Sequence, residues 1–315
     1  MDSTLTTEAR EVVCQLPKLS ELGLAIKGPE RLPRLTLPNL TKLTVEYDDN
    51  LEWLQGFHGA TLDKLESVIF RSYPKRFGNT LKNFERAAAR TTSIRNTLSR
   101  GNILENFAHA AGTTSIRNTL TRFRFTTSSS WDLGFSPLLS FTQLKELVIE
   151  FACASADCSS GVNDEFITTL AQAMPNLEVL QLGRSPCVTA GATVNGLVTL
   201  TSHCLHLSSL SIHFRGDTLA GEVKDAAIAS LPVDKSLVCA LTRLDVGDIP
   251  THGIEVEAVA RVLLRIFPRI SHLESASINW KWRRVEQEMS DLRQSGTSIC
   301  CQGKAYPLVA FNNSR

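Results

Sequence analysis

The residues best equipped for metal chemistry are cysteines and histidines in two short clusters. His203, Cys204 and His206 offer soft metal ligands, but ligands on adjacent residues point in different directions and no second Cys/His cluster stands at a zinc-finger distance. Cys153 and Cys158 lie in a predicted loop, where they could form an opportunistic bridge or metal pair. We therefore expect no metal site, with Cys204 in the core and the histidines at the periphery.

Two pairs of neighbouring carboxylates, Asp48-Asp49 and Asp164-Glu165, are the candidates for acid–base catalysis. Such catalysis needs two groups in distinct environments around one cleft, and nothing in the sequence places either pair in a cleft. Asp164 precedes a predicted helix and is interpreted as a cap or first-turn carboxylate. The chain also lacks a Gly-rich phosphate loop and a His-Glu-x-x-His helix. We expect no enzymatic activity and no cofactor, and a hydrolase or transferase built on repeats is the third class of function considered.

Positive charge is concentrated in one segment of the chain. Between Arg71 and Arg124 there are eleven Lys or Arg residues and two acids, a local charge of +9 in a chain of net charge +1. Such a field steers acidic or phosphorylated ligands, and Arg suits bidentate recognition of carboxylate or phosphate. We predict that Arg71, Arg122 and Arg124 flank one binding patch, the alternative being a solvated surface. Nucleic acid is not the expected partner, because the segment lacks interleaved aromatic residues and the whole chain is nearly neutral.

Length and composition describe a soluble intracellular chain. Its 315 residues, 43% of them hydrophobic, suffice for a sizeable core. The apolar runs are shorter than the roughly 18–20 residues of a membrane span, and the first ten residues lack the basic-then-apolar order of a signal peptide. The eight cysteines have irregular spacing and fit reduced thiols. The composition excludes disulfide scaffolds, collagen-like chains and disordered chains. We expect a cytoplasmic or nuclear protein.

The elements that would position these side chains come from an internal repeat. The pattern apolar-x-x-apolar-x-apolar recurs, and its last two apolar positions face one side of a short strand. Upstream of several copies, apolar residues three and four apart predict a helix, as Phe166 and Leu170 do before Leu177. The copies are Leu19-Leu22-Leu24, Leu40-Leu43-Val45, Leu65-Val68-Phe70, Leu144-Leu147-Ile149, Leu177-Leu180-Leu182, Leu207-Leu210-Ile212 and Leu241-Leu244-Val246, with weaker ones at Leu120-Phe123-Phe125 and Ile270-Leu273.

A helix, a turn and one short strand cannot bury their own apolar faces, so neighbouring units must stack. We predict an irregular solenoid of about ten units over residues 1–295, beginning with a helix at 8–16. Residues 281–295 are predicted to form a helix that covers the last exposed strand, and 296–315 a loose tail. Residues 91–98 recur unchanged as 113–120, which indicates either a duplicated unit or an error in the gene model.

Two of these units resemble the cysteine-containing leucine-rich repeats common in F-box proteins. Residues 162–182 carry the resemblance, and residues 193–212 match again, with Cys204 at the position where this variety often has its helix cysteine. The resemblance covers about residues 8–280, and the tryptophan-containing C-terminal segment is similar to that of fungal F-box proteins with such repeats. It implies an α/β right-handed horseshoe, with parallel strands on the concave face and helices outside. An F-box itself is not expected within the chain.

By this resemblance, the concave face would bind a protein substrate for a cullin-type ubiquitin ligase. A ligase adaptor would be a partner only if an F-box lies outside this chain, and we expect a monomer. The alternative is a non-degradative scaffold or inhibitor that binds an acidic or phosphorylated partner. The outward strand positions predicted to contact the partner are Arg71, Arg122, Arg124, Glu146, Glu150, Gln181, Ser211, His213, Arg243 and Asp245.

Overall fold

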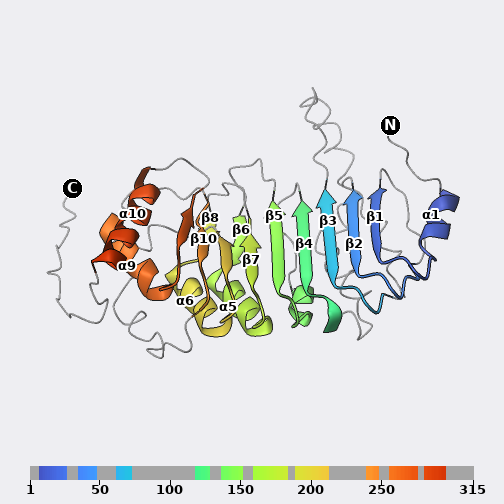
Figure 1. The fold of residues 1–315 in the computed structure, drawn as a ribbon, viewed down its shortest axis with the longest axis horizontal. Coiled ribbons are helices and arrows are strands. Elements are labelled where there is room, and N and C mark those ends of the chain that lie inside the picture. Colours follow the sequence, from blue (N-terminus) through green and yellow to red (C-terminus); the bar gives the residue numbers. More distant parts are fainter. Residues whose placement is uncertain are drawn as a thin grey trace, which may run out of the picture.

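The computed structural model of the chain describes residues 7–26, 35–47, 62–72, 118–127, 136–151, 159–183, 189–212, 239–247, 255–275 and 280–295. Within these residues a nine-stranded parallel sheet forms the spine, and its strands lie side by side in chain order (Figure 1). The predicted α/β class is confirmed. The strands are β1 (Glu21–Ile26), β2 (Lys42–Tyr47), β3 (Ser67–Ser72), β4 (Arg122–Thr127), β5 (Glu146–Phe151), β7 (Val179–Leu182), β9 (Ser209–Ile212), β10 (Arg243–Asp245) and β11 (His272–Glu274).

Each of the nine sequence copies coincides with one strand of this sheet. The register aligns equivalent apolar positions from strand to strand, so that Leu22 pairs with Leu43 and Leu24 with Val45. These side chains alternate with exposed residues and belong to one buried cluster that runs through the described units. In the weaker aromatic copy, Phe123 packs edge-to-face on Phe70, with ring centroids 5.9 Å apart. The aromatic copy therefore fills the same core position as the aliphatic ones.

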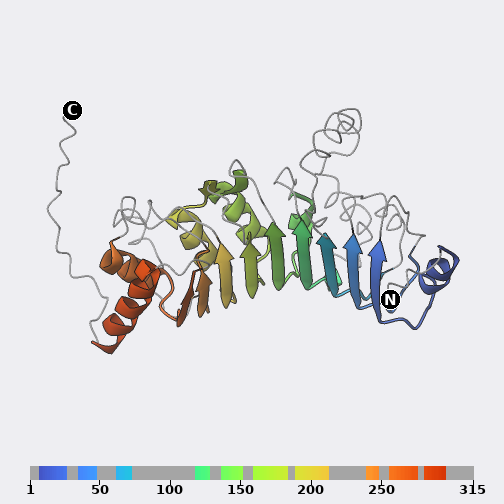
Figure 2. The ribbon, with the colours of Figure 1, turned by 90° about the horizontal axis from the view of Figure 1, so that it is seen from above.

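The helices lie against one side of the sheet and at its ends (Figure 2). The predicted N-terminal helix is shorter than expected, and the predicted terminal helix is displaced by one residue. One helix and a second, two-stranded sheet, β6 (Ser159–Asn163) with β8 (Thr189–Gly191), were not predicted. The helices are α1 (Thr7–Val13), α5 (Asp164–Ala173), α6 (Val194–His203), the unpredicted α9 (Val256–Ile266) and α10 (Trp280–Gln294), with a 3₁₀ helix at Ser136–Ser140.

A ladder of hydrogen bonds at the strand entrances sets the spacing between units. The N–H groups of Thr41 and Lys42 both donate to the carbonyl of Ser20, at 2.8 and 3.1 Å. The Thr41 hydroxyl donates to the same carbonyl at 3.0 Å. The pattern repeats along the stack, with hydroxyl donors at Thr121, Ser208, Thr242 and Ser271. Hydroxyl residues just before the strands therefore help to hold each unit in register on the one before it.

Helices α5 and α6 are joined by a carboxylate. Asn163 caps α5 by accepting the N–H of Phe166 at 2.8 Å. Asp164, in the first turn of α5, instead reaches the next unit, where it accepts the Thr193 N–H at 2.7 Å and the Thr193 hydroxyl at 2.5 Å. Thr193 in turn caps α6. Asp164 is thus a first-turn carboxylate, as expected, and it also links two repeats.

Buried cysteines make a similar link at the other end of these helices. The Cys204 thiol donates to the carbonyls of Ala171 and Met174, at 3.8 and 3.6 Å, at the end of α5. Cys239 repeats the contact one unit later, on the carbonyls of Cys204 and Leu207. The expectation that Cys204 is a core residue is confirmed. Each thiol contacts the carbonyl of the residue that caps the end of a helix, Met174 for α5 and Cys204 for α6, a position where carbonyls lack intrahelical partners.

The C-terminal edge of the sheet is covered by α10, which packs against α9 and β11. Arg293 donates to the carbonyl of Ile270, and Glu286 accepts the Leu273 N–H at 3.5 Å. Side chains of α10 therefore form hydrogen bonds with backbone groups at the outer edge of the last strand, where another chain would otherwise pair. Trp282 is buried, whereas Trp280 is 59% exposed. The tail at 296–315 and residues 91–117 of the duplicated segment lie outside the described residues.

Candidate protein-binding face

The side of the sheet opposite α5 and α6 carries the predicted contact residues (Figure 2). We define the open face as the strand side chains that alternate with the core residues. In β1 and β2 the two sets alternate strictly, one buried and the next exposed or half-buried. Because the register is continuous, open-face residues of neighbouring strands lie side by side in rows.

At the N-terminal end of the open face, each cation has one acidic neighbour. Lys42 on β2 lies 3.5 Å from Glu21 on β1, and Arg71 on β3 lies 3.4 Å from Glu46 on β2. Both contacts join consecutive strands, as cross-strand pairs do. Exposed pairs of this kind contribute little to stability, about 0–1 kcal/mol. Their effect is to leave this part of the face nearly neutral.

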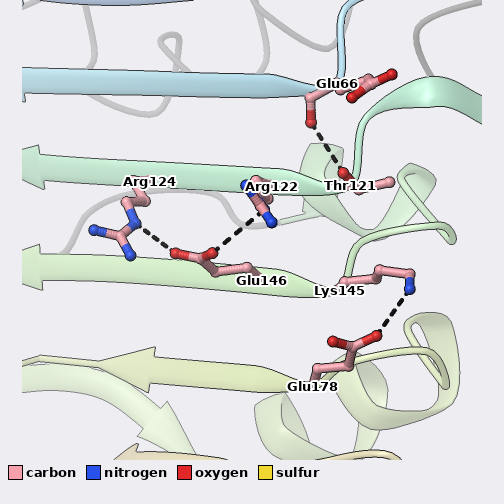
Figure 3. A network of polar contacts seen from close by, with 7 residues as sticks. All are labelled: Glu66, Thr121, Arg122, Arg124, Lys145, Glu146 and Glu178. Atoms are coloured by element: carbon pink, nitrogen blue, oxygen red, sulfur yellow. Dashed lines mark hydrogen bonds and ion pairs between the residues drawn. The ribbon is translucent and has the colours of Figure 1, made fainter. Parts of the chain in front are cut away.

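The centre of the face has two cations for one acid (Figure 3). Arg124 Nε on β4 donates to Glu146 Oε1 on β5 at 2.5 Å, and Arg122 Nε lies 3.8 Å from Glu146 Oε2. The carboxylate is largely covered, with 17% of its side chain exposed, while the two arginine side chains are 67% and 52% exposed. We call Arg122, Arg124 and Glu146 the arginine triad.

A second ion pair lies beside the triad at the strand entrances. Lys145 Nζ contacts Glu178 Oε1 at 2.8 Å, one residue before β5 and β7 begin. The hydrogen bond from Lys145 holds the pKa of Glu178 below its usual value, and the charges of His206 and Arg122 act in the same direction. The positive field of Arg122 therefore extends to this neighbouring unit.

Beyond the triad the face becomes more polar and less charged. Glu150 on β5 accepts hydrogen bonds from the Thr126 hydroxyl at 3.4 Å and from the Gln181 amide at 3.3 Å. Val148 and Val179, also on this face, are the register partners of Arg124 and Glu146 respectively. These two valines were not among the predicted contact residues, although their alternation with the core leucines places them on the outward side.

The C-terminal strands carry a further pair and a hydrogen bond. Ser211 on β9 donates to Asp245 Oδ2 on β10 at 3.1 Å, and Arg243 Nη2 lies 2.8 Å from Glu274 Oε2 on β11. The hydrogen bond to Glu274 raises the pKa of Arg243 above its usual value. Asp245 also accepts the N–H of Gly247, at 2.9 Å. Arg243 is thus matched by Glu274, with Asp245 as a further acid nearby.

Nine of the ten predicted contact residues are described, and all nine lie on strands of the sheet. Arg71 lies on β3, next to β4 with Arg122 and Arg124, so adjacent strands carry the three predicted arginines. Each of them has an acidic partner, which the prediction of a patch flanked by these three arginines did not include. His213 and most of the basic segment between Arg71 and Arg124 lie outside the described residues.

Two sequence-based comparisons were made for the chain. No protein-family model matches it. Comparison with curated proteins likewise finds no significant match. The function is therefore inferred from the fold and from the open face.

Other features of the described residues offer little chemistry. Among them, no group of three or more His, Cys, Asp or Glu side chains is placed to hold a metal ion. In the His203–His206 cluster, the Cys204 thiol is buried while the ring of His203 contacts the Thr199 carbonyl at 3.0 Å. Burial raises the pKa of Cys204 to about 12, so its thiol stays protonated. None of the described helices has both the length and the hydropathy to span a bilayer.

A cavity of about 300 Å³ lies between β11 and α10. It is lined by residues that include His272, Arg283, Glu286 and Arg293. Arg293 and Glu286 are the same side chains that occupy the edge of the last strand. The cavity is therefore part of the seam between the terminal helix and the sheet.

Proposed function

We propose that the chain is a protein-recognition module that binds a partner on the open face. The observation that carries this proposal is the asymmetry of the sheet: one side is buried in a continuous core, while the other presents rows of polar and charged side chains. Nine strands at roughly 4.8 Å spacing extend over about 38 Å, and the strands, of three to six residues, are about 10–20 Å long. The sheet therefore offers roughly 600 Å², somewhat less than the about 800 Å² per partner of a standard interface.

The part of the open face between the arginine triad and the Arg243–Glu274 pair is the best-suited contact area. Gln181 and Ser211 are half-buried polar residues there, between the arginine triad and the Arg243–Glu274 pair. Side chains that are already held by cross-strand hydrogen bonds lose less conformational freedom on binding than mobile ones do. This area can therefore bind a protein segment without a large ordering cost.

The finer proposal is that the stack is a leucine-rich repeat domain of the cysteine-containing type. It is supported by the sequential parallel strands, by the leucines that fill equivalent core positions and by the buried cysteines Cys204 and Cys239. Through the same resemblance, the partner would be a protein substrate presented to a cullin-type ubiquitin ligase. The competing proposal is a scaffold or inhibitor that binds without degradation, which the open face would serve equally well.

Bulky substitutions on the two sides of the sheet test the binding face. Gln181→Trp and Ser211→Trp place large side chains on the open face, whereas Gln172→Trp adds the same group at an exposed position of α5. We expect the first two to weaken binding of a partner recovered with the wild-type chain at least about tenfold, and the third to leave it unchanged. Equal binding by all three variants would place the partner elsewhere.

The fate of the partner separates the two finer proposals. If the chain selects substrates for a ligase, its removal from cells should lengthen the half-life of the partner, and Ser211→Trp should have the same effect. A scaffold or inhibitor would leave the half-life unchanged while the complex still formed.

A further inference from the structure

We propose that the arginine triad binds a phosphorylated serine or threonine side chain of the protein that docks on the open face. This inference rests on the proposed function and adds the chemistry that the partner must carry.

The first argument is the way in which the two arginines are held. Both contact Glu146 through Nε, at 2.5 Å for Arg124 and 3.8 Å for Arg122. A guanidinium held through Nε keeps terminal nitrogens for another acceptor, and one terminal nitrogen of Arg124 points away from Glu146 (Figure 3). The fork of donors is thus oriented before a ligand arrives, which lowers the ordering cost of binding.

The second argument is charge. Two guanidinium groups share one carboxylate, so the triad has a surplus of one positive charge. The other open-face ion pairs in the described strands, Lys42–Glu21, Arg71–Glu46 and Arg243–Glu274, each match one cation to one acid. Beside the triad, Glu178 is engaged by Lys145, and in Figure 3 the carboxylate of Glu66 points away from Arg122. Glu150, the next acid along β5, is held by Thr126 and Gln181 and not by an arginine, so the triad is the point of the described strands where two cations share one acid.

The third argument concerns the kind of anion. Both guanidinium groups face Glu146 with Nε, Arg124 at 2.5 Å from one carboxylate oxygen and Arg122 at 3.8 Å from the other. A carboxylate ligand has two oxygens and can fill one fork. A phosphate monoester carries a charge of about −1.5 to −2 and three acceptor oxygens, which can serve both. The neighbouring Val179, which is half-buried, offers an apolar contact for the residue beside the phosphate, whereas Val148 is only 5% exposed.

Short peptides test this recognition directly on the full chain. The probes are fluorescent peptides of sequence Gly-Ala-X-Ala-Gly with blocked ends, in which X is phosphoserine, serine or glutamate. By fluorescence anisotropy, we expect the phosphoserine peptide to bind at least about tenfold more tightly than either other peptide, the ratio that one charge-assisted hydrogen bond supplies. Equal affinity for the glutamate peptide would overturn the choice of phosphate over carboxylate, and tighter binding of a single-stranded oligonucleotide would overturn the choice of a protein ligand.

Variants locate the site and separate fork recognition from simple charge. Arg122→Gln/Arg124→Gln should weaken phosphopeptide binding about tenfold or more, and Arg122→Lys/Arg124→Lys should also weaken it severalfold because lysine lacks the planar fork. Arg243→Gln, the matched control from a one-to-one pair, should change it less than twofold. An equal effect of Arg243→Gln would refute the triad as the site. If the peptides fail while Ser211→Trp still blocks a protein partner, the phosphate inference falls and the proposed binding face stands.

Discussion

Replacing Asp164 by Ala should loosen the junction between two stacked units. The carboxylate accepts two hydrogen bonds from Thr193, at 2.7 and 2.5 Å, across a separation of 29 residues. A hydrogen bond to a charged group contributes about 1.5–3 kcal/mol, and Asp164 is half-buried, so the lower end of that range applies to each bond. The lost interaction with the dipole of α5 adds about 0.3–1 kcal/mol. We expect the free energy of unfolding to fall by about 3–4 kcal/mol.

Urea denaturation followed by circular dichroism measures this loss, and Glu165→Ala is the matched control. Glu165 also lies in the first turn of α5, but it is exposed and its carboxylate makes no hydrogen bond with another described unit. Its removal should cost only the dipole contribution, about 0.3–1 kcal/mol. Hydrogen exchange in Asp164→Ala should accelerate at the start of α6, where Thr193 caps the helix.

A double-mutant cycle with Thr193→Val isolates the link itself. Coupling of about 1–2 kcal/mol between the two positions is expected, since residues in direct contact are not additive. Equal destabilisation by Asp164→Ala and Glu165→Ala, with additive effects in the cycle, would refute the conclusion that this carboxylate couples neighbouring repeats.

Two further predictions concern the same part of the stack. A Cβ on Gly196 would lie 2.6 Å from Asp164 Oδ1 and 2.9 Å from Ile167 Cδ1. We therefore expect Gly196→Ala to lower the free energy of unfolding by about 1–3 kcal/mol, measured by urea denaturation. Gly23 has open space around it, so Gly23→Ala should cause no clash and serves as the control. Burial, with a smaller effect of Cys239, raises the pKa of Cys204 to about 12 from a reference of 9.0. The unfolded chain therefore loses this proton first, and stability should fall by up to about 1.4 kcal/mol per pH unit between about pH 9 and 12. In Cys204→Ala, measured under reducing conditions, this fall should be shallower, and an unchanged slope would exclude Cys204 as its cause.

The strands were predictable because one rule governs all of them. Alternation of apolar residues within five positions defines a strand with one buried side, and its recurrence requires stacking. The rule tolerated aromatic substitution, since Phe123 and Phe125 occupy the same core positions as leucines elsewhere. The burial of Cys204 followed in the same way from its position at the end of a predicted helix.

Contacts between units were less predictable than the units themselves. That Asp164 bonds to Thr193 depends on how two helices lie side by side, and nothing in the local sequence states that placement. Helix α9 was not predicted, although Val259, Leu263 and Ile266 have helical spacing. The two-stranded sheet β6–β8 has no apolar alternation to reveal it.

The candidate site shows the same division. Alternation correctly assigned the described contact residues to strands, but charge counting along the chain did not reveal the acids beside the predicted arginines. Cross-strand register pairs Arg71 with Glu46 and Arg122 with Glu146, and Arg124 reaches Glu146 diagonally. Sequence-local charge could not reveal this pairing, because the acids come from neighbouring units 22–25 residues away.

Site-specific photo-crosslinking tests the central claim most directly. A photoreactive phenylalanine analogue is placed at Gln181 or Ser211 on the open face, or at Gln172 on α5, and the chain is irradiated with the partner that it binds. If the open face is the recognition surface, the partner should be captured from the first two positions and not from the third. Capture from Gln172 alone would show that the partner sits on the helical side and would contradict the account.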